Sequence, residues 1–71
     1  MSAAEKLDQP HYAAKWVRGN VMESTFGITQ EAARKYRERG VWLEGRHWRK
    51  DPQGRIVYSP AAIDTWFESG Q

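Results

Sequence analysis

The chain has 71 residues, close to the lower size at which one hydrophobic core can hold a fold unaided, so a single domain is expected. It has no cysteine, which excludes disulfides and cysteine-ligated zinc, and its two histidines are too few for a convincing metal site; we expect neither metal nor cofactor. No apolar run approaches the ~20 residues that span a bilayer, and the polar N-terminus lacks a signal-peptide stretch, which predicts a cytoplasmic protein with no membrane association.

Charge is distributed unevenly along the chain. Residues 34–55 hold eight basic and three acidic side chains, a net charge of +5, whereas the other positions hold three basic and six acidic ones, a net charge of −3. Such a field attracts a polyanion to one surface and orients the protein as it approaches. An ordinary solvated face is the alternative explanation, so the asymmetry alone does not establish a nucleic-acid partner.

The N-terminal part divides into a tail and the start of the domain. Residues 1–10 carry little apolar material, which predicts a flexible tail, and residues 11–71 are expected to form the single domain. Residues 11–17 predict a short extended segment that leads into a turn. From Asn20 the apolar residues have helical spacing, and Asn20 with Glu23 resembles a capping pair, which predicts a first helix of about two turns.

A tight turn followed by a second helix is predicted between Phe26 and Gly40. Gly27 supplies the backbone freedom for the turn, and the Thr29 hydroxyl can accept a hydrogen bond from a first-turn amide, so the helix should begin near Gln30. Gly40 can adopt the left-handed conformation that ends a helix. The short connection forces the two helices to cross steeply, as in a helix-turn-helix.

The second helix is predicted to have a small apolar face and a polar, largely basic one. Ala33 and Tyr36, together with Ile28, are expected to face the core. The residues expected to point away from the core are Gln30, Glu31, Arg34, Lys35, Arg37 and Glu38. A surface helix whose charges merely keep the protein soluble is the alternative, because charges opposite an apolar stripe are usual.

A β-hairpin is predicted after the second helix. Two alternating segments, residues 46–50 and 55–58, flank Asp51-Pro52-Gln53-Gly54, whose residue types fit a type I turn. The tip of the hairpin is therefore a protruding basic loop, flanked by Arg49, Lys50 and Arg55.

The alternation also predicts the side-chain directions in the hairpin. In the first strand Trp48 should face the core, whereas His47 and Arg49 should face outward. In the second strand Ile56 and Tyr58 should share one face. Aromatic residues of this kind are expected to supply much of the small core, because each buries more area than an aliphatic side chain.

The chain closes with a third helix. Ser59 is a good N-cap and Pro60 a good first helical residue, since its missing amide costs nothing there. An apolar stripe follows, and Gly70 is expected to end the helix, which we assign to core support. The predicted fold is therefore α+β: a small winged helix-turn-helix with a β-hairpin wing and a C-terminal supporting helix.

No pattern in the sequence points to an enzyme. There is no glycine-rich phosphate loop, no nucleophile-elbow pattern, and no histidine flanked by a plausible acid or nucleophile. A chain of this size also offers little room for a pocket that excludes water. We therefore predict a binding protein without catalytic residues.

Most of the chain, from Trp16 to Phe67, resembles the small phage and prophage excisionases, winged-helix relatives of MerR-type DNA-binding heads. The resemblance is carried by Trp16-Val17, Phe26-Gly27-Ile28-Thr29, Ala33…Tyr36…Arg39-Gly40-Val41, Gly45-Arg46-His47-Trp48 and Tyr58-Ser59-Pro60-Ala61-Ala62-Ile63…Trp66. It implies a non-catalytic recombination directionality factor that binds attachment-site double-stranded DNA, bends it and directs a tyrosine-type integrase toward excision. The implied partners also include other copies along the DNA and a host DNA-bending protein.

The resemblance also implies which residues contact DNA. Early outward residues of the second helix, Gln30, Glu31, Arg34 and Lys35, would lie in the major groove, and Arg49, Lys50 and Arg55 of the wing would reach the adjacent minor groove or its phosphates. Thr29 and Arg37 of the helix and Gln53 of the wing complete the candidate set. A carboxylate facing DNA repels phosphate, so Glu31 is expected to read a base or to orient a neighbouring arginine.

Two other functions fit the same pattern. One is a small phage transcriptional regulator with the same fold. The other is a protein-protein inhibitor that uses the basic face to bind an acidic partner. Duplex binding that weakens steeply with salt, and a specific sequence that outcompetes bulk DNA, distinguish both DNA functions from the inhibitor.

Overall fold

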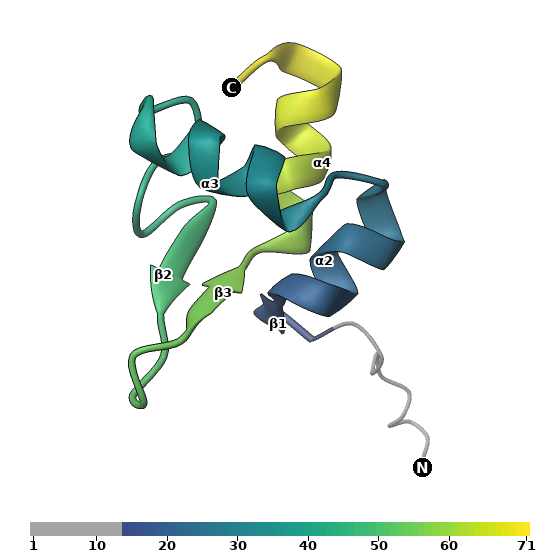
Figure 1. The fold of residues 1–71 in the computed structure, drawn as a ribbon. Coiled ribbons are helices and arrows are strands. Elements are labelled where there is room, and N and C mark those ends of the chain that lie inside the picture. The colour runs from purple at the N-terminus through teal and green to yellow at the C-terminus, as the bar shows by residue number, and fades with distance from the viewer. Residues whose placement is uncertain (1–13) are drawn as a thin grey trace, which may run out of the picture.

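The structure is a computed structural model that describes residues 14–71; the predicted tail, residues 1–10, lies outside the described residues. This part of the chain is α+β, with three helices and a three-stranded antiparallel sheet (Figure 1). The elements in chain order are β1 (Val17–Arg18), α2 (Gly19–Phe26), α3 (Gln30–Glu38), β2 (Trp48–Lys50), β3 (Ile56–Tyr58) and α4 (Pro60–Ser69). The β2–β3 hairpin projects away from the helices, and α4 lies at the other end of the molecule (Figure 1).

The sheet has the strand order β1-β3-β2. Trp48 pairs with Tyr58 and Lys50 with Ile56, so the predicted hairpin is confirmed, with strands shorter than the alternating segments. On the other side of β3, Val17 pairs with Tyr58. Of the extended segment predicted for residues 11–17, residues 11–13 lie outside the described residues and Val17 begins the third strand, whose pairing could not be recognised in the sequence. The turn predicted after this segment is wrong, because Gly19 already starts α2.

The start of α2 differs from the prediction. The helix begins at Gly19, its N-cap is Arg18, and no side chain caps it. Asn20 is thus inside the helix, and the predicted Asn20–Glu23 capping pair is wrong. The reason lies in the sheet: Arg18 is still paired with Val57 in β1, so the chain passes directly from strand into helix.

The predicted ends of the other two helices are confirmed. The Thr29 hydroxyl accepts from the Ala32 amide at 3.1 Å at the start of α3, and the Ser59 hydroxyl caps α4 in the same way. Gly40 has φ 76°, and the Val41 amide donates to the Tyr36 carbonyl at 2.9 Å, which closes α3 with a Schellman-type end.

The core is small and rich in aromatic residues, as predicted. Its buried members are Met22, Ala33, Trp42, Tyr58 and Ile63. Trp42, 1% exposed, lies at the centre: its ring centroid is 5.1 Å from that of Tyr36, 5.6 Å from that of Trp66 and 5.8 Å from that of Tyr58. One tryptophan thus joins α3, β3 and α4.

His47 was predicted to face outward, and this is wrong: its side chain is 1% exposed. It precedes β2, so the strand alternation does not apply to it. Its Nδ1 accepts a hydrogen bond from the Leu43 amide at 2.9 Å, its Nε2 lies 3.2 Å from the Gln71 carbonyl oxygen, and its ring stacks on Trp42. Burial lowers the pKa of His47, which keeps the ring neutral.

Candidate nucleic-acid interface

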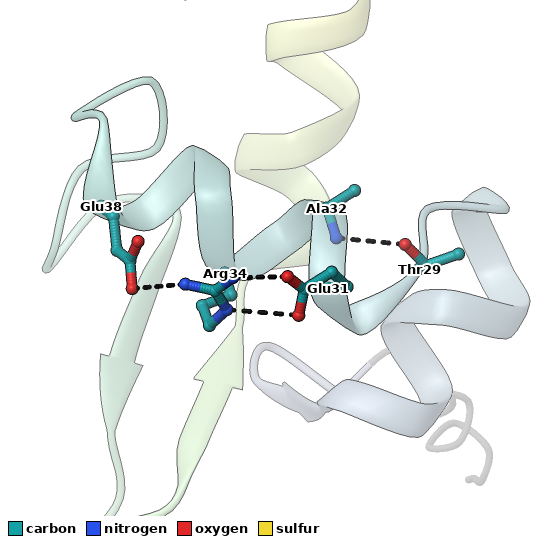
Figure 2. A network of polar contacts seen from close by, with 5 residues as sticks. All are labelled: Thr29, Glu31, Ala32, Arg34 and Glu38. Carbon is teal, nitrogen blue, oxygen red and sulfur yellow. Dashed lines mark hydrogen bonds and ion pairs between the residues drawn. The ribbon is translucent and has the colours of Figure 1, made fainter.

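The first turn of α3 is fixed by the turn that precedes it. Gly27 adopts a left-handed conformation, φ 71°, and its amide donates to the Glu23 carbonyl at 2.8 Å, which ends α2. Two residues later the Thr29 cap starts α3 (Figure 2). Because the Thr29 hydroxyl is engaged in the cap, its role here is to hold the helix start, and the exposed side chains of Gln30 and Glu31 come directly after it.

A network of charges covers the exposed face of α3 (Figure 2). The Arg34 guanidinium donates to both carboxylate oxygens of Glu31, with 3.2 Å between Nε and Oε1, and to Glu38 with 2.7 Å between Nη1 and Oε2. The hydrogen bond and charge of Arg34 lower the pKa of Glu31, and the two carboxylates raise that of Arg34. The two carboxylates therefore fix the orientation of the Arg34 guanidinium. The three side chains together carry a net charge of −1.

Arg37 does not point outward, which corrects the sequence prediction. Its Nη1 donates to the Tyr58 hydroxyl, and its guanidinium carbon lies 5.7 Å from the ring centroid of Trp48 and 5.9 Å from that of Tyr58. These contacts leave Arg37 half-buried. The helical wheel could not reveal this direction, because the aromatic rings that attract the guanidinium belong to the sheet.

The hairpin tip is a turn held together by hydrogen bonds to Asp51. Its carboxylate accepts hydrogen bonds from the Gln53 and Arg55 amides at 2.8 and 2.9 Å. The bond from the Arg55 amide has the largest effect on the pKa of Asp51, and together the two bonds lower that pKa although burial raises it. The Gly54 amide donates to the Asp51 carbonyl at 2.9 Å, with Gly54 at φ 83°, as a hairpin turn requires. Arg18 approaches the same carboxylate at 3.5 Å and so ties β1 to the loop.

A groove of about 410 Å³ lies between α3 and the hairpin, and it brings several of the predicted residues together. It is lined by Gly19, Gln30, Glu31, Arg34, Arg37, Arg55, Ile56 and Tyr58. Gly19 was not predicted from the sequence. Its missing side chain leaves room for Gln30, because a Cβ at this position would lie 2.7 Å from Oε1 of Gln30. Ile56 and Tyr58 also line the groove, and the only indication of this in the sequence was the prediction that they share one face of their strand.

Other predicted residues lie elsewhere. Arg49 pairs with Val57 in the sheet, and its guanidinium lies 5.6 Å from the ring centroid of Trp16, on the opposite face from Tyr58. Arg49 and Lys50 line a second groove of about 350 Å³ on that side. Lys35 is exposed on α3 and Gln53 is exposed at the tip, and neither lines the first groove.

Residues 14–71 contain neither a cluster of metal ligands nor a membrane-spanning helix. No three histidine, cysteine, aspartate or glutamate side chains of this part of the chain gather in a way that would hold a metal ion. None of its helices is both long enough and apolar enough to cross a membrane.

Comparison with known proteins gave one finding. Neither the curated proteins nor the solved structures include a match to the chain. A family model described as "Putative excisionase (DUF1233)" matches residues 9–71. Because this match covers α2, α3, the hairpin and α4, and nearly all of the 71 residues, the chain belongs to that excisionase family.

Proposed function

We propose that the protein is a sequence-specific, non-catalytic excisionase that binds double-stranded DNA with α3 in the major groove and the hairpin at the adjacent minor groove. Family membership over residues 9–71 is the observation that carries this proposal. The groove between α3 and the hairpin supports it, because three arginines line it. In this proposal residues 11–71 form one winged helix-turn-helix unit, related to MerR-type heads, with the hairpin as its wing.

The side chains differ in what they can do to DNA. Arginine pairs with guanine edges, glutamine with adenine and glutamate with cytosine, whereas lysine and arginine on a loop mainly neutralise phosphates. Gln30, Glu31 and Arg34 occupy the exposed first half of α3, and we assign base reading to them, with Lys35 beside them. The wing residues Lys50, Gln53 and Arg55 are assigned to the backbone.

Excision requires more than one small domain on one site. A single unit contacts few base pairs, and bending 20–30 base pairs costs on the order of 1–6 kcal/mol in smooth elastic estimates. Several copies bound side by side, with a host DNA-bending protein, supply the contacts that offset this cost. The bent DNA then lets a tyrosine-type integrase assemble in the arrangement that excises the prophage.

A reconstituted reaction tests this function. Purified integrase, the host DNA-bending protein and DNA carrying both prophage junctions are incubated with and without the protein, and the excised product is measured. We expect excised product when the wild-type protein is present. We expect little or none when a folded Arg34→Ala variant replaces it. Equal product with and without the wild-type protein would reject the excisionase function, whereas salt-sensitive duplex binding without excision would favour a transcriptional regulator.

A further inference from the structure

Arg37 is a half-buried cation whose side-chain partners within residues 14–71 are all neutral. It donates to the Tyr58 hydroxyl and lies against the Trp48 and Tyr58 rings, and Tyr58 itself is 2% exposed. The ion pairs within residues 14–71 involve only Arg18 and Arg34, so no carboxylate of this part of the chain lies within 4.0 Å of Arg37. Partly burying a charge without a counter-ion is unfavourable, which points to an anion from outside residues 14–71.

Other arginines line the groove beside Arg37, which suits the binding of an anion. Arg55 lines the same groove from the hairpin side and also forms no ion pair with residues 14–71. Glu31 is the one carboxylate among the described residues that line the groove, and it is paired with Arg34. Arg37 and Arg55 are therefore arginines of the groove that form no ion pair within residues 14–71, although the charge of Arg55 also acts on Asp51. A guanidinium has five N–H donors, and the Tyr58 hydroxyl uses one of those on Arg37, so donors remain for a ligand oxygen.

We propose that this groove seats one phosphodiester of the DNA backbone, with Arg37 as the residue that binds it and Tyr58 as the residue that positions Arg37. The inference rests on the proposed function. If α3 and the hairpin enter neighbouring grooves of the duplex, the sugar-phosphate strand that separates those grooves passes between them. Arg37 and Arg55 lie on the two sides of that passage. Arg37 then contributes affinity for any sequence and no discrimination between sequences.

Single-phosphate neutralisation tests the proposal. A duplex selected from a random pool is prepared as a series, each member carrying one neutral methylphosphonate, and binding is measured by fluorescence anisotropy. Wild type is compared with Arg37→Gln and with Arg39→Gln, a matched charge change at an exposed residue that does not line the groove. One methylphosphonate is expected to weaken wild type and Arg39→Gln about tenfold, the loss of one charge-assisted hydrogen bond, and to leave Arg37→Gln unaffected.

Salt dependence gives a second, independent readout. For Arg37→Gln the slope of log K against log salt concentration should fall in magnitude by about 0.9, the value for one phosphate contact, while the ratio of affinities for selected and random DNA stays that of wild type. Tyr58→Phe keeps the ring and removes only the hydroxyl, so it should weaken the response to the same phosphate. If circular dichroism shows Arg37→Gln to be unfolded, Tyr58→Phe takes its place in the series.

The outcomes separate this inference from the proposed function. If every methylphosphonate affects the Arg37→Gln and Tyr58→Phe variants as it affects wild type, the phosphate seat is rejected while DNA binding stands. An altered ratio of selected to random DNA affinity in Arg37→Gln would assign Arg37 to base reading and would also reject it. Wild-type protein that does not bind duplex DNA at low salt would reject the proposed function itself.

Discussion

Replacing Arg34 with alanine tests whether α3 reads bases. Arg34 forms three hydrogen bonds to two carboxylates, so alanine removes one positive charge and leaves both Glu31 and Glu38 without their cationic partner. A bidentate arginine contact to a guanine edge provides roughly 5- to 150-fold discrimination against the wrong base. We therefore expect Arg34→Ala to reduce the ratio of affinities for selected and random duplexes by a factor in this range.

The assay is fluorescence anisotropy on both duplexes at several salt concentrations. Lys50→Ala is the comparison for a backbone contact, and it should weaken binding to both duplexes by the same factor. Glu38→Gln is the matched control on α3: it removes one partner of Arg34 and keeps the two-point pairing with Glu31, so discrimination should persist. If Arg34→Ala loses affinity equally on both duplexes, Arg34 does not read bases.

Three further predictions concern the fold that holds this face. Thr29→Ala removes the N-cap of α3 and should lower the free energy of unfolding by about 1 kcal/mol in urea titrations; an unchanged midpoint would contradict this role. Ile63→Ala, at a position that is 0% exposed, should cost about 2–5 kcal/mol by the same measurement, and less than 1 would show that the core collapses around it. The pKa of His47 lies below its ordinary value of 6.5, so the unfolded chain binds a proton first, and stability should fall as pH drops through about 6.5. His47→Asn should reduce this loss, and an identical pH dependence in both proteins would refute it.

The parts of the fold that the sequence predicted correctly are those fixed by local chemistry. The Thr29 and Ser59 hydroxyls bond to amides three residues away, and Asp51 bonds to amides two and four residues away. Gly40 ends α3 because its own backbone takes a left-handed conformation. None of these features depends on the rest of the molecule, so residue types at fixed spacing were sufficient to locate them.

The errors arose where distant segments decide the outcome. Asn20 is not the N-cap of α2, because β1 pairs with β3 up to Arg18 and the helix begins at the next residue. His47 is buried because Trp42 and Gln71 surround it, and neither contact is visible in strand alternation. In both places a local pattern suggested one arrangement, and tertiary contacts selected another.

The candidate site shows the same division. The exposed positions of Gln30 and Arg34 on α3 follow from the helical period, and the structure places Arg55 across the groove from them. Two arginines take directions that the sequence did not predict: Arg37 turns toward Tyr58 while still lining the groove, and Arg49 turns toward Trp16. Each guanidinium lies near an aromatic ring from another part of the chain, and the spacing of basic residues could not predict this contact.

In the proposed function, α3 and the hairpin form one DNA-binding face. Titration of ¹⁵N-labelled protein with the selected duplex, followed by amide chemical shifts, tests it most directly. If the two elements bind DNA together, the largest shifts should fall on Gln30–Glu38 and on residues 50–58, α4 should change little, and a scrambled duplex should produce much smaller changes. Largest shifts on α4, or equal responses to both duplexes across the protein, would contradict it.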